Sequence, residues 1–153
     1  MINLFFLKKI KKINKKKIKY IINKIIINEK KNIYKINYIF CNNKYILYIN
    51  NFYLKKNEYT DTITFNYSNN NKILYGDIFI SIDQIIYNSI KYNQLFNKEL
   101  KRVLIHSTLH LIGYKDNNYY NSNKMLIKEN FYLKKYKKII FIFKKKKKNE
   151  KKI

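Results

Sequence analysis

The spacing of apolar residues along the chain predicts a mixture of strands and helices. Alternation with a period of two is typical of strands, and it occurs in residues 34–40, 62–67 and 78–82. The short apolar segment of residues 1–7 is also predicted to be a strand. Apolar residues three and four apart are typical of helices, and they occur in residues 14–25, 45–52, 83–92, 97–111 and 122–133. The predicted fold class is therefore α/β or α+β: a single domain with one small mixed sheet packed by about five helices.

Local signals refine this prediction at several boundaries. Asn14 and Asn97 precede apolar helical patterns, where a side-chain oxygen can cap the first free N–H groups. The β-branched residues of segment 62–67 favour an inner strand. The asparagine-rich residues 68–71 predict a turn, which would make segments 62–67 and 78–82 a hairpin.

The character of the chain changes near its carboxyl end. We therefore divide it into a domain of residues 1–133 and a tail of residues 134–153, almost wholly lysine with an apolar insert. The tail is expected to be helical at first and frayed from Lys144. A lysine tail can hold RNA phosphates, but it can equally be a solvated terminus.

The composition affects how the charge is interpreted. The chain has 34 Lys and Arg residues against 9 Asp and Glu, a net charge of +25, and it lacks Ala, Pro and Trp. This is the bias expected of a very AT-rich genome, so many lysines reflect codon usage and not a polyanionic partner. The single cysteine, Cys41, rules out an internal disulfide and is expected to be a buried thiol. No signal peptide or membrane span is apparent, and we expect a cytoplasmic protein.

The only two histidines lie four residues apart on an apolar segment. His106 and His110 would project from one face of a helix, where both rings can bind one metal ion. Gly113 stands where the helix would end, since glycine accepts the left-handed conformation of a helix terminus. The chain can then return Asp116 as a third ligand. The spacing H-x3-H-x5-D predicts a zinc site with an open coordination position.

Three motifs, in order, resemble those of the YbeY family of metal-dependent endoribonucleases. Residues 105–114, I-H-S-T-L-H-L-I-G-Y, closely resemble the family signature H-G-x-L-H-L-x-G-Y. Residues 60–65 resemble its T-D-V-L-S-F strand, and residues 76–81 its G-D-I strand. The resemblance covers roughly residues 1–133. It implies maturation of bacterial ribosomal RNA, with the 3′ end of the small-subunit RNA as target.

The chain departs from the family pattern at the metal motif and at one basic position. Ser107 replaces the usual glycine, and Asp116 stands where the family usually has a third histidine. A carboxylate is an acceptable zinc ligand, although it makes manganese or another divalent ion more favourable than three histidines would. The family arginine that is held to act in catalysis is replaced by Leu54. Lys55, Lys56 and Arg102 are the candidate substitutes for binding the RNA backbone.

We weigh three functions. In the first, a zinc-dependent endoribonuclease, His106, His110 and Asp116 hold one Zn²⁺, His106 is also assigned a catalytic role, and the substrate is single-stranded RNA of the ribosomal small subunit. In the second, a metallopeptidase-like hydrolase, a glutamate would follow the first histidine as general base, but Ser107 stands there. The third is a non-catalytic ribosome- or RNA-binding protein with a degenerate metal site.

Overall fold

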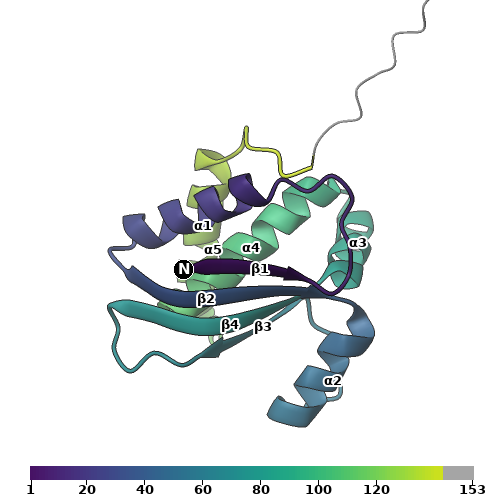
Figure 1. The fold of residues 1–153 in the computed structure, drawn as a ribbon, viewed down its shortest axis with the longest axis horizontal. Helices are drawn as coiled ribbons and strands as arrows, with labels where there is room; N and C mark the ends of the chain where they lie inside the picture. Colours follow the sequence, from purple (N-terminus) through teal and green to yellow (C-terminus); the bar gives the residue numbers. More distant parts are fainter. Residues whose placement is uncertain (143–153) are drawn as a thin grey trace, which may run out of the picture.

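A mixed four-stranded sheet organises the molecule (Figure 1), and the computed structural model describes residues 1–142. The strands, in the sheet order β1-β2-β4-β3, are β1 (Ile2–Phe6), β2 (Asn32–Cys41), β4 (Ile73–Ser81) and β3 (Thr62–Asn66). The helices are α1 (Lys15–Asn28), α2 (Asn43–Leu54), α3 (Ile82–Lys91), α4 (Phe96–Ile112) and α5 (Tyr119–Lys135). β1, β2 and β4 are parallel and β3 is antiparallel to β4. The predicted class, a mixed sheet with five helices, is confirmed.

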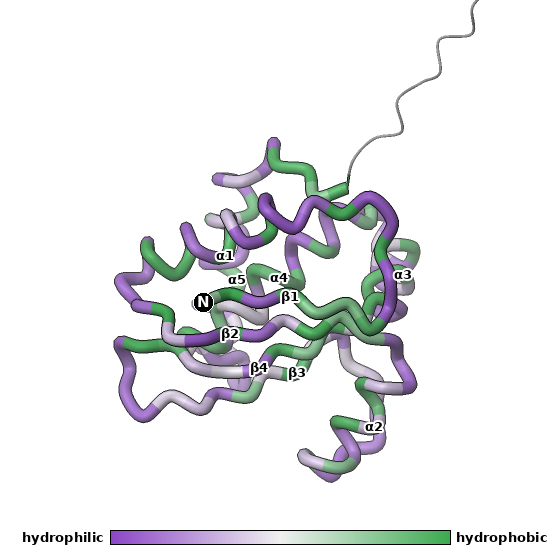
Figure 2. Tube along the Cα trace, viewed as in Figure 1, coloured by the Kyte–Doolittle hydropathy of each residue, from purple (hydrophilic) through white to green (hydrophobic). Residues whose placement is uncertain are grey.

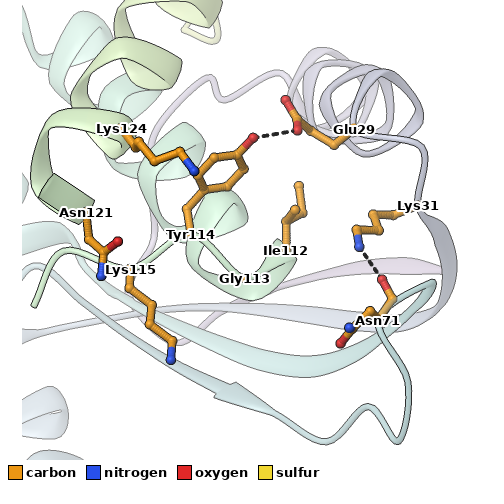
Figure 3. A pocket seen from close by; sticks show the side chains of 9 residues that line it. All are labelled: Glu29, Lys31, Asn71, Ile112, Gly113, Tyr114, Lys115, Asn121 and Lys124. Carbon is orange, nitrogen blue, oxygen red and sulfur yellow. Dashed lines mark hydrogen bonds between the residues drawn. The ribbon is translucent and has the colours of Figure 1, made fainter.

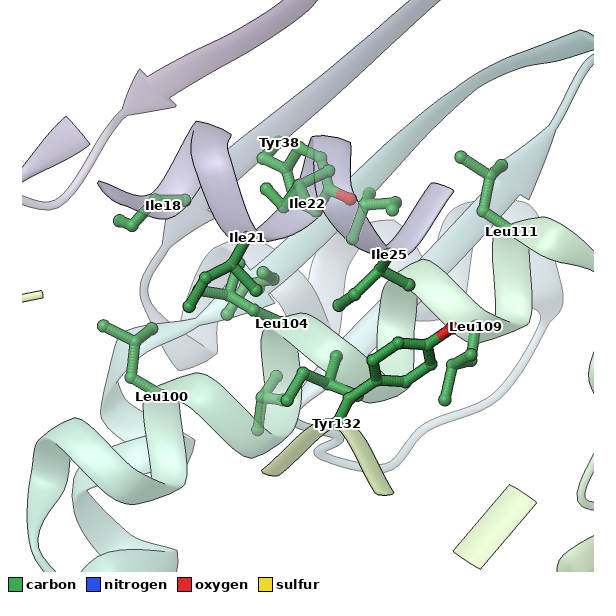
Figure 4. Packing of buried hydrophobic residues seen from close by; sticks show 14 of the residues in the cluster. Ile18, Ile21, Ile22, Ile25, Tyr38, Leu100, Leu104, Leu109, Leu111 and Tyr132 are labelled. Atoms are coloured by element: carbon green, nitrogen blue, oxygen red, sulfur yellow. The ribbon is translucent and has the colours of Figure 1, made fainter. Parts of the chain in front are cut away.

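The helices are distributed unequally over the two faces of the sheet. α1, α4 and α5 lie on one side and α2 lies on the other (Figure 1). The main core lies between the sheet and the first group, where isoleucines of α1 meet leucines of α4 (Figure 4). Tyr38 of β2 is fully buried there, and its hydroxyl lies 2.7 Å from Thr108 Oγ1. The hydroxyl is therefore paired, as burial requires.

α1 forms where the pattern predicted it. Asn14 is the N-cap, and its side-chain oxygen accepts a hydrogen bond from Lys17 N at 3.1 Å. The buried stripe consists of Ile18, Ile21, Ile22, Ile25 and Ile26. Hydrophobic and hydrophilic residues alternate along this helix (Figure 2), so one face packs in the core and the lysines point to solvent.

β3 and β4 form the predicted hairpin, but β3 is an edge strand. Within the described part of the chain it pairs only with β4, so the expectation of an inner strand was wrong. α4 packs against one side of β3, and the β-branched Ile63 is buried on the other side against Ile46 and Ile49 of α2. Asn66 Nδ2 donates to Leu111 O of α4 at 3.2 Å. Gly76 allows the same close approach, because a Cβ there would lie 2.3 Å from Phe65 O and 2.7 Å from Leu111 Cδ1.

Two boundary predictions differ from the structure. The N-cap of α4 is Leu95, which makes no side-chain cap hydrogen bond, so the predicted Asn97 cap was wrong. Asn97 Oδ1 accepts from Phe141 N at 2.8 Å instead. Phe141 is fully buried, so the packing of the domain extends beyond residue 133, where we predicted the tail to begin. The predicted frayed segment from Lys144 lies outside the described residues.

α2 packs on the second face of the sheet and buries only a narrow stripe. Ile46 and Ile49 join Cys41 and Ile63 in a small separate core, which confirms the buried thiol. Burial, followed by the nearby Asp83 charge, raises the pKa of Cys41 to about 12. The aromatic residues of α2 point outward. Within residues 1–142 we find no helix with the length and apolar content that crossing a bilayer requires.

Candidate metal centre

The two histidines converge on one point beside the sheet. Both project from the last turns of α4, and their Nε2 atoms are 3.0 Å apart. The rings are nearly perpendicular, with centroids 4.5 Å apart. His106 is 17% exposed and His110 is 26% exposed, so both rings are largely shielded but open on one side.

The turn after α4 returns Asp116 to the histidines. Gly113 ends the helix with a φ of 124°, in the region that favours glycine, and its N–H donates to His110 O at 3.1 Å. Asp116 Oδ2 lies 3.3 Å from His110 Nε2 and 3.7 Å from His106 Nε2. One donor atom of each residue lies within 4.8 Å of the others. The structure therefore brings together the three residues that the spacing predicted.

His110 is held in the form that a metal requires. Its Nδ1 lies 3.0 Å from Tyr114 O, so Nδ1–H donates to that carbonyl and Nε2 keeps its lone pair. Burial and the neighbouring His106 lower the pKa of His110, and they outweigh the opposing effects of Asp116 and Tyr114 O. A neutral imidazole with a free Nε2 is the state that binds a divalent cation.

Glu129, which the sequence did not single out, lies behind His106. It comes from α5, is 6% exposed, and its Oε2 is 3.2 Å from His106 Nδ1. The distance suits a hydrogen bond but the angle does not, so among residues 1–142 the buried Nδ1 has no hydrogen-bond partner. A carboxylate behind a metal-binding histidine is a common arrangement, because it orients the ring and favours the Nδ1–H tautomer. The donor set and this neighbour fit a divalent cation.

Arg102 lies among carboxylates, one helical turn before His106. Its Nη2 is 2.7 Å from Glu99 Oε1 and 3.0 Å from Asp61 Oδ2, and its Nη1 is 3.5 Å from Glu129 Oε1. Burial lowers the pKa of Arg102, but Glu99 and the other carboxylates outweigh it, so the net change is upward. The structure gives Arg102 three acidic partners. Its role at the RNA backbone stays a prediction.

The donor atoms open into a cleft of about 430 Å³ between α4 and the edge strand β3. Its lining includes Leu54 and Lys56 at the end of α2, but not Lys55. The polar lining residues that sequence reasoning missed are Asn50, Glu58, Thr62, Thr64 and Asn66. Thr62 Oγ1 is buried without a hydrogen-bond partner among the described residues. The edge position of β3, which periodicity alone does not reveal, explains why Thr62, Thr64 and Asn66 were missed.

A larger pocket of about 560 Å³ lies on the other side of the Gly113 turn (Figure 3). It contains Glu29, whose carboxylate accepts hydrogen bonds from Tyr114 at 2.9 Å, Lys128 at 2.9 Å and Tyr132. Burial raises the pKa of the Glu29 carboxyl, but the hydrogen bonds from Tyr132, Lys128 and Tyr114 outweigh it and hold the pKa below its usual value of 4.5. This carboxylate is fully engaged, so we place the chemistry in the smaller cleft.

Comparisons with known proteins point to one family. The model of the family described as Endoribonuclease YbeY matches residues 5–137. Proteins of that name from Karelsulcia muelleri and Chlorobium limicola are 57% identical over 48% of this chain and 49% identical over 50% of it.

These two matches span 52% and 53% of the relatives' own length, so the chain spans about half the length of the curated relatives it matches. The solution structure of TM1509 from Thermotoga maritima is 27% identical with a TM-score of 0.66, covering 88% of this chain and 87% of that one. The family match covers most of the described fold, including both histidines and Asp116. The chain belongs to the YbeY family.

Proposed function

We propose that the protein is a metal-dependent endoribonuclease that acts in ribosomal RNA processing. The observation that carries the proposal is the convergence of His106, His110 and Asp116 on one point at the wall of a cleft. The relatives named Endoribonuclease YbeY support RNA as the substrate. We further propose the 3′ end of small-subunit ribosomal RNA as the target and the cytoplasm as the location.

We propose one Zn²⁺ as the cofactor. Two imidazoles and one carboxylate form a donor set typical of catalytic zinc, and the open side of the cleft leaves a position for substrate. A cation bound there supplies Lewis acidity for reactions at a phosphodiester. Because Asp116 is 49% exposed and is a hard oxygen donor, manganese is the second candidate.

The protein's own groups have separate tasks in this proposal. Tyr114 O orients His110 through its Nδ1–H. Glu129 orients His106 from behind, and Arg102 holds the Glu129 carboxylate in place. Lys56 lines the cleft and is the basic group best placed to contact the phosphate backbone, because the neighbouring Leu54 carries no charge.

The two alternative functions differ in support. A peptidase-like mechanism needs a general base after the first histidine, but Ser107 is fully buried and donates to Leu104 O at 3.2 Å within α4. This argues against the peptidase. One observation supports a non-catalytic RNA-binding protein: Leu54 stands where the family usually has an arginine.

The experiment is cleavage of a single-stranded RNA by the purified full chain, with and without a chelator, followed by return of Zn²⁺ or Mn²⁺. We expect cleavage to stop with the chelator and to return with the metal. His110→Ala should not be rescued by metal, whereas Tyr87→Ala, on the exposed side of α3, should behave as wild type. Cleavage that survives complete metal removal would contradict the proposal, and binding without any cleavage would favour the non-catalytic alternative.

A further inference from the structure

The second face of the sheet is only partly covered. α2 packs over the part of this face near the carboxyl ends of β2 and β4, where Phe65 and Phe79 contact the small core. Beyond α2, no described element packs on the remainder, which we call the open face (Figure 1). The open face is defined by side chains from β1, β2 and β4 and from the residue that follows β3: Asn3, Tyr34, Lys35, Asn37, Tyr67, Tyr75 and Asp77.

Polar side chains form a hydrogen-bonded row across the open face. Asn3 Nδ2 donates to Asn37 Oδ1 at 2.9 Å, and Asn37 Nδ2 donates to Asp77 Oδ1 at 2.8 Å. Tyr67 donates its hydroxyl to Asp77 Oδ2 at 3.1 Å. A face that was covered by another apolar layer would carry apolar side chains at these positions. The row therefore marks a surface that stays in contact with water or with a polar ligand.

Three tyrosines lie along one side of the polar row. The Tyr75 ring is 5.3 Å from the ring of Tyr34 and 5.4 Å from that of Tyr67, both in edge-to-face geometry. Their exposed fractions are 65% for Tyr34, 46% for Tyr67 and 39% for Tyr75. Edge-to-face contacts fix the rings while leaving their outer surfaces free. The tyrosines thus form a fixed aromatic platform.

The platform is continuous with the metal cleft around the edge strand. Successive residues of a strand point to opposite faces, so Thr64 and Asn66 line the cleft while Phe65 and Tyr67 face the platform side. A second set of rings leads from α2 to the same strand, because Tyr53 is 5.6 Å from Phe65. An extended RNA chain leaving the cleft would contact these rings next.

The charge of the surface favours a polyanion as its occupant. Lys35 pairs with Tyr75 across β2 and β4, and Lys72 is the last residue of the turn before β4. The one acidic member of the open face, Asp77, is already engaged by Asn37 and Tyr67. A second copy of this chain is the competing occupant, but each copy carries a net charge of +25 and would repel the other.

We propose that the open face binds single-stranded RNA, with unpaired bases stacking on Tyr34, Tyr67 and Tyr75 and with Lys35 contacting the phosphates. Aromatic rings bind bases of any sequence because every base has a π-face, whereas paired bases are not available for such stacking. The inference rests on the proposed function, since it extends the path of the same substrate from the cleft. It assigns the tyrosines to holding RNA and not to its cleavage.

The test is the affinity of a short fluorescein-labelled single-stranded RNA, measured by fluorescence anisotropy in the presence of a chelator so that no cleavage occurs. The double variant Tyr67→Ala/Tyr75→Ala should raise Kd roughly five- to hundredfold for each base that loses its ring. Tyr67→Phe/Tyr75→Phe keeps the rings and should keep the affinity. The matched control is Tyr87→Ala/Tyr92→Ala, which removes two rings of similar exposure, 57% and 59%, from the α3 region.

Circular dichroism checks that each variant is folded, and Tyr67→Leu/Tyr75→Leu replaces the alanine variant if that one unfolds. Unchanged RNA affinity in a folded ring-deletion variant overturns the platform, even where metal-dependent cleavage is intact. Self-association of the wild type that these variants abolish, with RNA affinity unchanged, would make the face an interface between copies and also overturn the proposal. Loss of affinity in the variants supports the platform even if the wild type fails to cleave, so the two proposals fail separately.

Discussion

Replacing Arg102 by methionine should destabilise the protein, because the guanidinium neutralises carboxylates that water hardly reaches. Methionine keeps most of the apolar stem and removes the charge. Glu99 and Glu129 have side chains only 5% and 8% exposed, and both would lose their cationic partner. Removing one member of a buried ion pair costs about 3–5 kcal/mol. Arg102 itself is 31% exposed, so solvent screening puts our expectation near the lower end, about 3 kcal/mol.

The assay is urea unfolding of wild type, Arg102→Met, Glu99→Gln and the double variant. The double variant should lose less than the sum of the single ones, because Glu99→Gln removes the charge that Arg102 neutralises. Arg102→Lys should fall between wild type and Arg102→Met, since an ammonium keeps the charge but not the forked geometry. Unchanged stability of Arg102→Met together with weaker RNA binding would refute this reasoning and restore the sequence-based assignment of Arg102 to the RNA backbone.

Substitutions at three further positions have expected outcomes. Asp116→His should retain zinc and Asp116→Asn should weaken its binding, measured by competition with a chelating dye, because imidazole suits zinc and a neutral amide removes the anionic charge. Gly76→Ala should cost about 2 kcal/mol in urea unfolding, since its Cβ would overlap Phe65 O at 2.3 Å; wild-type stability would contradict this packing. Glu29→Gln should cost about 2 kcal/mol at neutral pH. Because the folded pKa of Glu29 lies below 4.5, its stabilisation is complete above that pH and is lost as the pH falls through the folded pKa. A difference from wild type that grows on acidification would contradict this sign.

The sequence predicted most of the secondary structure because the pattern is strong on the elements that face the core. α1 is the best case, with one stripe of isoleucines and an asparagine cap. α2 shows the limit of this reasoning. Tyr48 and Phe52 share the helical spacing of Ile49, yet they are 58% and 63% exposed. Periodicity shows that a face is apolar, but it does not show whether another element covers it.

The proposed metal ligands were predictable because they are close in the sequence, whereas the residues that support them were not. His106, His110 and Asp116 are related by one helix and one glycine turn, so local geometry brings them together. Glu129 reaches His106 from α5, and its position depends on how two helices pack. Arg102 was predicted to bind the RNA backbone because the sequence does not reveal the three carboxylates that surround it.

The most direct test of the account is the metal content of the purified full chain, measured by mass spectrometry, for wild type, His106→Ala and His110→Ala. The account predicts about one zinc ion per wild-type chain, as expected for a single set of three ligands. Each histidine variant should lose the bound metal, because both Nε2 atoms face the same point. Full metal retention in either folded variant would contradict the site and, with it, the mechanism proposed for the protein.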